Sequence, residues 1–380
     1  MNFGKFAVSA LSLALAFSLS GCGKTENTGN VIKIGSVSPL TGPQTHIGKD
    51  NENGARLAVD EINAKGLELG GKKVTLELFG EDDQAEPKAA TIVAQKLVDT
   101  GVVAVIGHLN SGTTIPASKI YFDAGIPQIS PSATAVAYTA QGYNTAYRVM
   151  ANDAQQGRVL GQFAVAKLGA KKIAIIDDRT AYGQGLADEF EKAAKAAGGE
   201  VVAREFTNDR ATDFTAILTS IKGKAPDLVF YGGMDPQGGP MVKQLKSLGL
   251  TARFLSGDGV QNVNFMKLAG ADAEGVVASS PGLAIDAMPG GPAFRKRFEA
   301  KYGAIQSYAP YAYDAVYVLV EAMKRAGSAE PAKVLAELPK TDLQGVSGPV
   351  KFDAKGDTTG GAVTLYEVKG GKWQVLETIK

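Results

Sequence analysis

The sequence predicts an α/β protein built on two parallel-rich sheets, and two observations lead to this fold class. Short apolar runs of strand type alternate with segments of ten or more residues that have helical spacing, which is the pattern of βαβ units. The chain has 380 residues, more than one hydrophobic core usually supports. It also contains enough βαβ units for two sheets.

The elements follow one another regularly up to about residue 325. The expected strands cover residues 31–37, 74–79, 102–106, 126–129, 173–176, 228–231, 254–255 and 276–278. The expected helices cover residues 53–64, 87–99, a stretch from 114, 152–168, a stretch up to 197, 214–221, 239–248, 292–302 and 311–325. The pattern then changes to β-type runs at 350–352, 362–368 and 372–376. Between the last two runs, Gly370 and Gly371 indicate a hairpin.

The amino terminus has the pattern of a lipoprotein signal peptide. Lys5 precedes an apolar run at 6–19 that is too short to span a bilayer comfortably. Leu-Ser-Gly-Cys at 19–22 resembles the lipobox of bacterial lipoproteins, which implies cleavage before Cys22 and a lipid on its sulfur. Cys22 is the only cysteine, so it has no intramolecular disulfide partner. Residues 1–21 are therefore the expected signal peptide and 22–30 a flexible tether; a plain signal peptide with an incidental cysteine is the alternative.

The charge of the expected mature chain is balanced. Residues 1–21 hold one lysine and no acidic residue, so 40 basic and 39 acidic residues become 39 and 39. A neutral chain argues against nucleic acid as a partner. No later stretch approaches 18 consecutive apolar residues, so we expect no membrane-spanning helix. The expected location is the periplasm or cell surface, with a lipid anchor at the amino terminus.

Two neighbouring strand ends offer a place for a small anion. The strand at 102–106 is followed by Asn-Ser-Gly-Thr at 110–113, where a helix can begin. A helix start provides unpaired backbone N–H groups and a partial positive charge, which together suit a carboxylate. The strand at 126–129 leads into Ser-Pro-Ser-Ala-Thr at 130–134. Ordinary loop sequence between strands and helices is the alternative interpretation.

The candidate binding residues share one feature, because each follows an expected strand. They are Ser111, Ser132, Thr134, Tyr182, Met234 and Asp258. Ligands of open α/β sheets bind at the carboxyl ends of strands. Such a set suits a zwitterion, with hydroxyl and N–H groups for a carboxylate and Asp258 for an ammonium group. Asp258 lies between two glycines and could instead be a turn residue, and Met234 could serve packing alone.

The sequence does not favour an enzyme. It holds only two histidines, His46 and His108, and no Gly-x-Ser-x-Gly element, Walker loop or complete dinucleotide fingerprint. The acidic cluster at 81–83 lacks the alternating ligand spacing of a calcium loop. We therefore expect no catalytic residue, metal or cofactor.

Six stretches together resemble the branched-chain amino-acid-binding (Leu/Ile/Val-binding) protein family, the extracytoplasmic receptors of ABC transporters. The likeness runs from about Val31 to the carboxyl end. The stretches are VDEINAKG at 59–66, VIGHL at 105–109, SPSAT at 130–134, YGQGLA at 182–187, YGG at 231–233 and GVSGPVKFD at 345–353.

This resemblance implies the type I periplasmic-binding-protein fold, in which two Rossmann-like lobes joined by a three-crossover hinge close on a ligand. Lobe 1 would comprise residues 31–152 plus 282–362. Lobe 2 would comprise residues 153–281 plus 363–380. The implied partners are a small, aliphatic or branched-chain amino acid and the permease subunits of an ABC importer, bound by a monomer. The alternative is an amide or short organic-acid binding or sensing module of the same fold.

The resemblance also implies a role for each site residue. Ser111 and Thr134 would hold the ligand carboxylate. The backbone at Ser132, together with Thr134, would meet the ammonium group. Tyr182 and Asp258 would close from the second lobe. Ile47 and Met234 fall where the family often has aromatic residues facing the ligand, and Tyr308 falls where a Phe can line the pocket. Asp258 stands where the best-known members carry Glu, which is one methylene longer.

Overall fold

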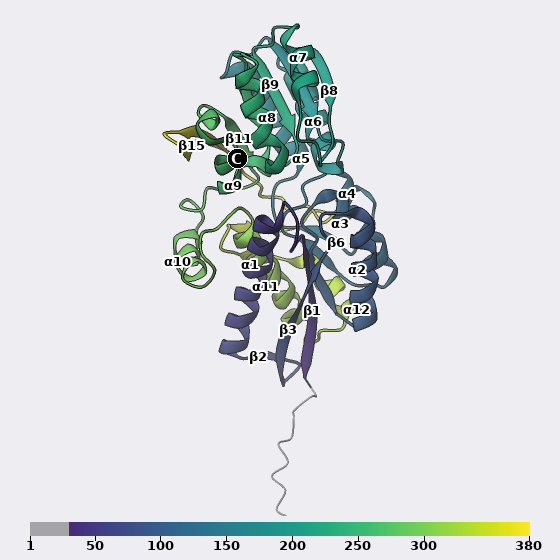
Figure 1. Cartoon of the computed structure of the whole chain (residues 1–380). Coiled ribbons are helices and arrows are strands. Elements are labelled where there is room, and N and C mark those ends of the chain that lie inside the picture. The colour runs from purple at the N-terminus through teal and green to yellow at the C-terminus, as the bar shows by residue number, and fades with distance from the viewer. Residues whose placement is uncertain (1–29) are drawn as a thin grey trace, which may run out of the picture.

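The computed structural model describes residues 30–380, which form two large sheets covered by helices and one two-stranded sheet (Figure 1). The expected signal peptide, Cys22 and nearly all of the expected tether lie outside these residues. No helix in the described range is both long and apolar enough to cross a membrane. The two parallel-rich sheets confirm the predicted fold class.

The first sheet has the strand order β2-β3-β1-β4-β5-β6. All its strands pair in parallel except β2 with β3. Every residue of β4 and β5 is buried, as expected for central strands covered on both faces. The strands are β1 (Val31–Ser38), β2 (Leu67–Leu69), β3 (Lys72–Asp82), β4 (Ala104–Gly107), β5 (Gln128–Ser130) and β6 (Ala146–Arg148).

Helices from both ends of the sequence pack with this sheet. Helix α11 lies along α1 and also contacts β4, although more than 200 residues separate the two helices in the chain. We call this part of the molecule the first lobe. Its helices are α1 (Thr45–Lys65), α2 (Pro87–Thr100), α3 (Ser111–Asp123), α4 (Ala137–Ala140), α10 (Gly291–Tyr302), α11 (Ala309–Ala326) and α12 (Pro331–Glu337). Two short strands, β12 (Leu343–Gln344) and β13 (Pro349–Val350), pair with each other.

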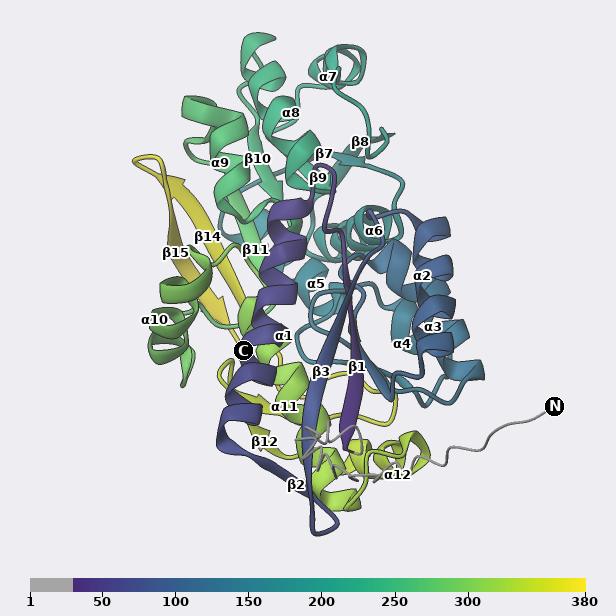
Figure 2. The same ribbon diagram turned by 60° about the horizontal axis from the view of Figure 1, so that its bottom comes forward.

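The second sheet has the order β15-β14-β11-β10-β9-β7-β8 and forms the second lobe. The chain's last strands, β14 and β15, return to this sheet beside β11 and run antiparallel (Figure 2). The strands are β7 (Lys172–Asp177), β8 (Glu200–Phe206), β9 (Leu228–Gly232), β10 (Arg253–Ser256), β11 (Val277–Ser280), β14 (Val363–Lys369) and β15 (Lys372–Ile379). The helices are α5 (Asp153–Ala166), α6 (Ala181–Ala196), α7 (Thr215–Lys222), α8 (Asp235–Ser247) and α9 (Val263–Ala269).

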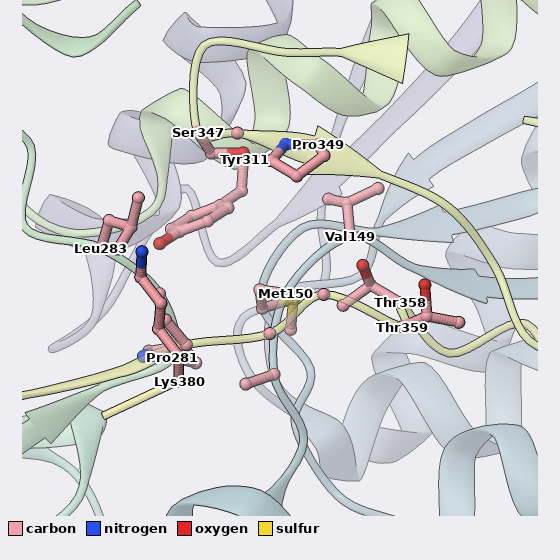
Figure 3. A pocket seen from close by; sticks show the side chains of 16 residues that line it. Val149, Met150, Pro281, Leu283, Tyr311, Ser347, Pro349, Thr358, Thr359 and Lys380 are labelled. Atoms are coloured by element: carbon pink, nitrogen blue, oxygen red, sulfur yellow. The ribbon is translucent and has the colours of Figure 1, made fainter. Parts of the chain in front are cut away.

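The chain passes between the lobes three times, after β6, after β11 and before β14. We propose that the lobes divide near residues 152, 281 and 362. These three segments come together around a hollow of about 320 Å³, which is also lined by Tyr311, Ser347 and Lys380 (Figure 3).

Several elements differ from the sequence-based prediction. Helix α1 begins at Thr45 instead of 53, because its first turns pack into the core: Ile47 is 1% exposed. A side chain at Gly48 would lie 1.9 Å from the carbonyl oxygen of Pro39, so this glycine permits a close backbone approach. Helix α8 begins at Asp235 instead of 239. The prediction missed β2, β6, β8, β12, α4, α9 and α12.

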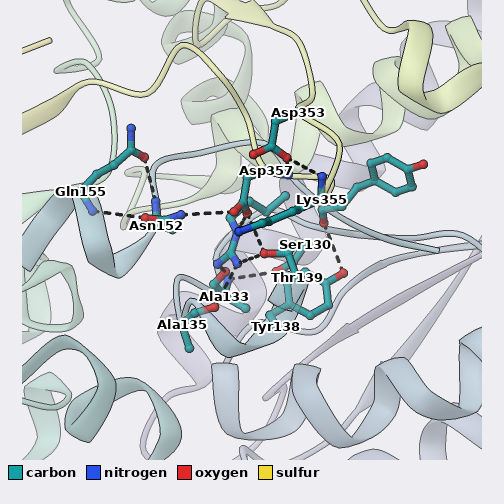
Figure 4. Close-up of polar contacts among 12 residues, drawn as sticks. Ser130, Ala133, Ala135, Tyr138, Thr139, Asn152, Gln155, Asp353, Lys355 and Asp357 are labelled. Carbon is teal, nitrogen blue, oxygen red and sulfur yellow. Dashed lines mark hydrogen bonds and ion pairs between the residues drawn. The ribbon is translucent and has the colours of Figure 1, made fainter. Parts of the chain in front are cut away.

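A buried arginine joins the first lobe to the last crossover. The guanidinium of Arg148 is fully buried, pairs with Asp357, and donates to the carbonyl oxygens of Ala133 and Ala135 at 2.8 and 3.0 Å (Figure 4). The other carboxylate oxygen of Asp357 accepts from Asn152, the residue that caps α5. The loop after β5, the segment before β14 and the start of α5 are therefore held by one network.

Asp357→Ala is expected to lower the free energy of unfolding by about 3–5 kcal/mol, because it leaves the Arg148 charge buried without its carboxylate. Urea denaturation followed by circular dichroism measures this difference. Asp342→Ala is the matched control, since its pair with Lys351 is more than half exposed on both sides. The control should lose no more than about 1 kcal/mol. Equal losses in both variants would contradict the assigned role of the buried pair.

Candidate functional site

The first part of the site is the start of helix α3, just after β4. Asn110 is the residue before the helix and has extended backbone angles, and Ser111 is the first helical residue. The first N–H groups of a helix have no partner within it, so the amides of Ser111 and Gly112 are available to an anion. The Ser111 hydroxyl accepts from the backbone N–H of Ala135 at 3.1 Å, which joins this turn to the next loop.

The second part is the loop after β5, the parallel neighbour of β4. The Ser132 hydroxyl donates to the Leu109 carbonyl at 3.1 Å and accepts from the Asn51 amide at 3.0 Å. The Ser130 hydroxyl accepts from the backbone N–H of Ala133 at 2.9 Å. These bonds hold the two strand ends side by side, as the sequence predicts for parallel neighbours.

The third part is the carboxylate of Asp258, which follows β10 in the second lobe. One oxygen accepts from the Gln156 amide at 3.0 Å and the Tyr182 hydroxyl at 2.9 Å. The other accepts from the Tyr308 hydroxyl at 2.6 Å. Asp258 is 4% exposed, and burial raises its pKa while the bonds from Tyr308, Gln156 and Tyr182 oppose that rise. All three donors are neutral, and no cationic side chain of residues 30–380 forms an ion pair with this carboxylate.

Tyr308 reaches Asp258 from the first lobe and is positioned by another buried acid. Asp50, on α1, accepts hydrogen bonds from the backbone N–H groups of four consecutive residues at the start of α11, from Gln306 to Ala309. Burial raises the pKa of Asp50, and these four bonds oppose the rise. The carboxylate thus satisfies donors that the helix itself cannot. Tyr308 is the residue before that helix, so Asp50 sets the direction from which its side chain crosses the cleft.

These parts enclose a small cavity between the lobes. Its free volume is about 10 Å³, roughly the space of a single water molecule. An amino acid therefore requires the lobes to part before it can enter. The lining residues are Leu109, Asn110, Ser111, Ser132, Tyr182, Met234, Asp258 and Tyr308.

Six of the eight sequence-predicted residues lie on this wall. Thr134 does not, although it is only 1% exposed and lies between Ala133 and Ala135, which Arg148 holds. Ile47 also does not; it lies in the first turn of α1 and is 1% exposed. A close backbone approach brings the second-lobe residues together: a side chain at Gly259 would lie 2.8 Å from the Met234 sulfur.

The sequence-based prediction missed three residues of the site: Leu109, Asn110 and Gln156. The first two are neighbours of Ser111 and could have been found from the same strand end. Gln156 lies in the first turn of α5, a helix whose start the sequence does predict. Only the crossover geometry brings this helix to Asp258, which is 102 residues away from Gln156 in the chain.

His108 has a structural environment. Its ring nitrogens lie 2.8 Å from an Asp83 carboxylate oxygen and 3.0 Å from the Tyr121 hydroxyl, and all three residues are fully buried. It supports the turn that leads to Ser111. Within the described part of the chain, no group of three or more His, Cys, Asp or Glu residues could hold a metal ion.

The geometry suits a small molecule that carries both charges. A helix start and a hydroxyl-rich loop in the first lobe favour an anion. A desolvated carboxylate, completed by residues of both lobes, favours a cation. The larger hollow at the hinge has no buried acidic side chain on its wall, so size alone does not identify the binding site.

Comparisons with known proteins agree with this architecture. Residues 31–372 match the profile of the family described as periplasmic binding protein. The leucine-, isoleucine-, valine-, threonine- and alanine-binding protein of Pseudomonas aeruginosa is 35% identical, and the match covers 97% of each chain.

Two solved structures show the same fold. One is the branched-chain amino-acid transporter substrate-binding protein of Streptococcus pneumoniae in complex with isoleucine. It is 31% identical, with a TM-score of 0.84 and coverage of 92% of this chain and 99% of that one. The other is a solute-binding protein from R. palustris in complex with benzoate. It is 26% identical, with a TM-score of 0.82 and coverage of 92% and 96%. The protein therefore belongs to the periplasmic binding protein family, among the relatives of the Leu/Ile/Val-binding proteins.

Proposed function

We propose that the protein binds a small aliphatic amino acid between its lobes and delivers it to an ABC importer, without catalysing a reaction. The observation that carries this proposal is the Asp258 carboxylate, which is buried, has three neutral donors and faces the start of α3 across the cleft. An ammonium group would supply the missing cation. The amino-acid ligands named for the Pseudomonas and Streptococcus relatives support the same ligand class.

Each end of the ligand has its own contacts in this proposal. The carboxylate lies at the amides that begin α3, with the Ser111 hydroxyl and the backbone of the loop after β5. The ammonium group lies between Asp258 and that loop, near Thr134. The side chain faces Leu109, Met234 and the ring of Tyr182. Since no charged group besides Asp258 lines the cavity, an uncharged aliphatic side chain fits best.

Hinge closure follows from this division of contacts. The carboxylate contacts belong to the first lobe and Asp258 to the second, so only the closed state satisfies both ends of the ligand. A ligand favours the state in which it makes more contacts, and it shifts the equilibrium by that difference in affinity. We also propose that the protein acts as a monomer and that it docks on the permease subunits of the importer.

A second candidate is a carboxylate binder that needs no ammonium group, favoured by the benzoate bound to the R. palustris relative. The protein is first unfolded and refolded to free it of ligand. Calorimetric titration of the refolded protein then separates the two candidate functions. The panel holds leucine, isoleucine, valine, alanine, phenylalanine and glutamate, together with isocaproate and benzoate. If aliphatic amino acids bind and isocaproate and benzoate do not, the result supports the amino-acid proposal. Equal binding of isocaproate and leucine would favour the second candidate.

Asp258→Asn is expected to weaken leucine binding by about 2–5 kcal/mol, because the ligand's ammonium group would be buried without a carboxylate. Titration calorimetry of the refolded variant measures the change. Asp286→Asn is the control, since that carboxylate is 73% exposed and pairs with Arg295 outside the cavity. If Asp258→Asn binds leucine as tightly as the control does, Asp258 is not the ammonium partner.

We also propose that the protein is anchored by a lipid on Cys22, which the lipobox-like sequence at 19–22 supports. When the full chain is expressed in a bacterial host, the protein should sediment with the membranes. Cys22→Ser should leave it uncleaved or release it, and mass spectrometry of the amino-terminal peptide should find the diacylglyceryl group only in the wild-type chain. An unmodified Cys22 in the wild-type peptide would contradict the anchor.

A further inference from the structure

His46 and Asp235 face each other across the closed cleft and belong to different lobes. His46 lies in the first turn of α1, and Asp235 is the first residue of α8. The His46 Nε2 atom lies 3.2 Å from an oxygen of the Asp235 carboxylate, and the two side chains are 21% and 0% exposed. A movement that parts the lobes separates the two groups, so this contact belongs to the closed state.

Asp235 is a buried acid without a cation from its own lobe. Asn264 donates at 2.6 Å to the oxygen that faces His46, and in the described chain the other oxygen has no hydrogen-bond partner. No lysine or arginine of residues 30–380 forms an ion pair with this carboxylate. A buried charge is costly unless it is paired, so Asp235 favours a cation supplied by the opposite lobe.

The charges around Asp235 favour a cation as well. Burial raises the pKa of the Tyr231 hydroxyl well above its ordinary value. The charges of three acids raise that pKa further, namely those of Asp178, Asp235 and Asp209. These acids follow β7, β9 and β8, which are neighbours in the second sheet. This end of the sheet is therefore a region of negative potential.

Two arginines of the same region are engaged elsewhere. The guanidinium carbon of Arg179 lies 3.8 Å from the centre of the Phe206 ring. Arg210 pairs with Glu86 at the surface. Neither arginine forms an ion pair with Asp235.

The charged neighbours of His46 on its own helix do not replace Asp235 as a partner. Lys49 is exposed to solvent. Asp50 accepts four backbone N–H groups at the start of α11. Neither residue forms an ion pair with His46, so Asp235 is the acid that its ring meets in the closed state.

Protonation decides what an imidazole offers to a carboxylate. The neutral ring carries one N–H group and no charge, whereas the protonated ring is a cation that donates from both nitrogens. A histidine ordinarily changes between these forms at about pH 6.5. An opposite charge at a distance of about 4 Å or less favours the charged form. Closure brings the Asp235 carboxylate to such a distance, and opening takes it away.

We propose that His46 and Asp235 form a proton-binding site that is completed only when the lobes close, so that the protein captures its ligand together with a proton. At low pH His46 is protonated in both states and the ion pair strengthens closure in full. This contribution is lost as the pH rises and the closed state gives up its proton. The inference rests on the hinge closure of the proposed function but not on the class of ligand.

The proton uptake is measured by titrating the refolded full-length protein with leucine in a calorimeter, in buffers of different ionisation enthalpy near neutral pH. We expect about half a proton to be taken up per leucine, as for a histidine that binds its proton about ten-fold more tightly after closure. Leucine should also bind at least about five-fold more tightly at about pH 5.5 than at about pH 8.5.

His46→Gln keeps a polar side chain at this position but removes the titratable group. It should lose the proton uptake and most of the pH dependence of leucine binding. Burial raises the pKa of Asp178 to about 6, so this acid titrates in a similar range. Uptake by Asp178 would persist in His46→Gln, and the difference between the two proteins therefore reports His46. Equal uptake in wild type and His46→Gln would overturn the proposal.

His108, the other histidine of the chain, does not complicate the measurement. Its ring nitrogens contact Asp83 and Tyr121, which belong to the same lobe, so these contacts do not change when the lobes close.

Arg210→Gln is the matched control, because it removes an exposed ion pair across the same cleft that does not titrate near neutral pH. This variant should keep the wild-type proton uptake. A loss as large as in His46→Gln would mean that any weakened closure lowers the uptake, and it would overturn the assignment to His46.

Asp235→Asn tests the other member of the pair, because it removes the charge but keeps an oxygen that can accept from Asn264. In a double-mutant cycle, His46→Gln, Asp235→Asn and the double variant should all show the same low uptake. Wild-type uptake in Asp235→Asn would overturn the proposal. If Asp235→Asn does not fold, the partly exposed His46 still provides the decisive variant.

Failure of this inference is distinguishable from failure of the proposed function. A wild-type protein that binds leucine without net proton uptake overturns the inference alone. If another member of the ligand panel binds in place of leucine, the same measurement with that ligand decides, because the pair lies outside the ligand cavity. A protein that binds no member of the panel overturns the proposed function together with this inference.

Discussion

The structure depends on one buried carboxylate that has hydrogen-bond donors but no cation. The three donors to Asp258 come from α5, α6 and the start of α11, and Tyr308 is the one that comes from the first lobe. Neutral donors reduce the desolvation cost of a carboxylate without neutralising its charge. A cationic group of a ligand would therefore stabilise the Asp258 carboxylate more than any residue of the cavity wall does. The stability of the closed state thus depends on whether such a group occupies the cleft.

Other buried charges hold the groups that act on the ligand. Asp50 fixes the start of α11 and thereby Tyr308, and Arg148 fixes the loop that contains Thr134. Both satisfy several backbone groups at once, which compensates for their burial. Since Arg148 also pairs with Asp357 next to the last crossover, the loop that would meet the ligand is connected to a segment that has to bend when the lobes move.

The fold could be predicted from the sequence because it rests on local patterns. Alternation of apolar runs and helical spacing gives the succession of strands and helices along the chain. The residues predicted after strands make up five of the eight residues of the cavity wall. What the sequence could not supply is contact between distant segments. Gln156 reaches Asp258 only because a crossover brings α5 against β11 and β14 of the second sheet. Ile47 lies in the core because α1 begins at Thr45, in a stretch whose glycines resemble a loop.

Closure must balance attraction between the lobes against the need to release the ligand. Beyond Tyr308 and Asp258, the lobes contact each other through His46 and Asp235, whose nearest atoms lie 3.2 Å apart, and through the exposed pair of Glu86 and Arg210. An exposed ion pair contributes little, so the pair of Glu86 and Arg210 biases the cleft without locking it. The cavity in the closed state is too small for an amino acid unless side chains of its wall give way. The Asp258 carboxylate already accepts three hydrogen bonds there, all from neutral donors. A hydrogen bond from an ammonium group is charge-assisted and therefore stronger than any of these, so a cationic group stabilises the closed lobes where a neutral group does not.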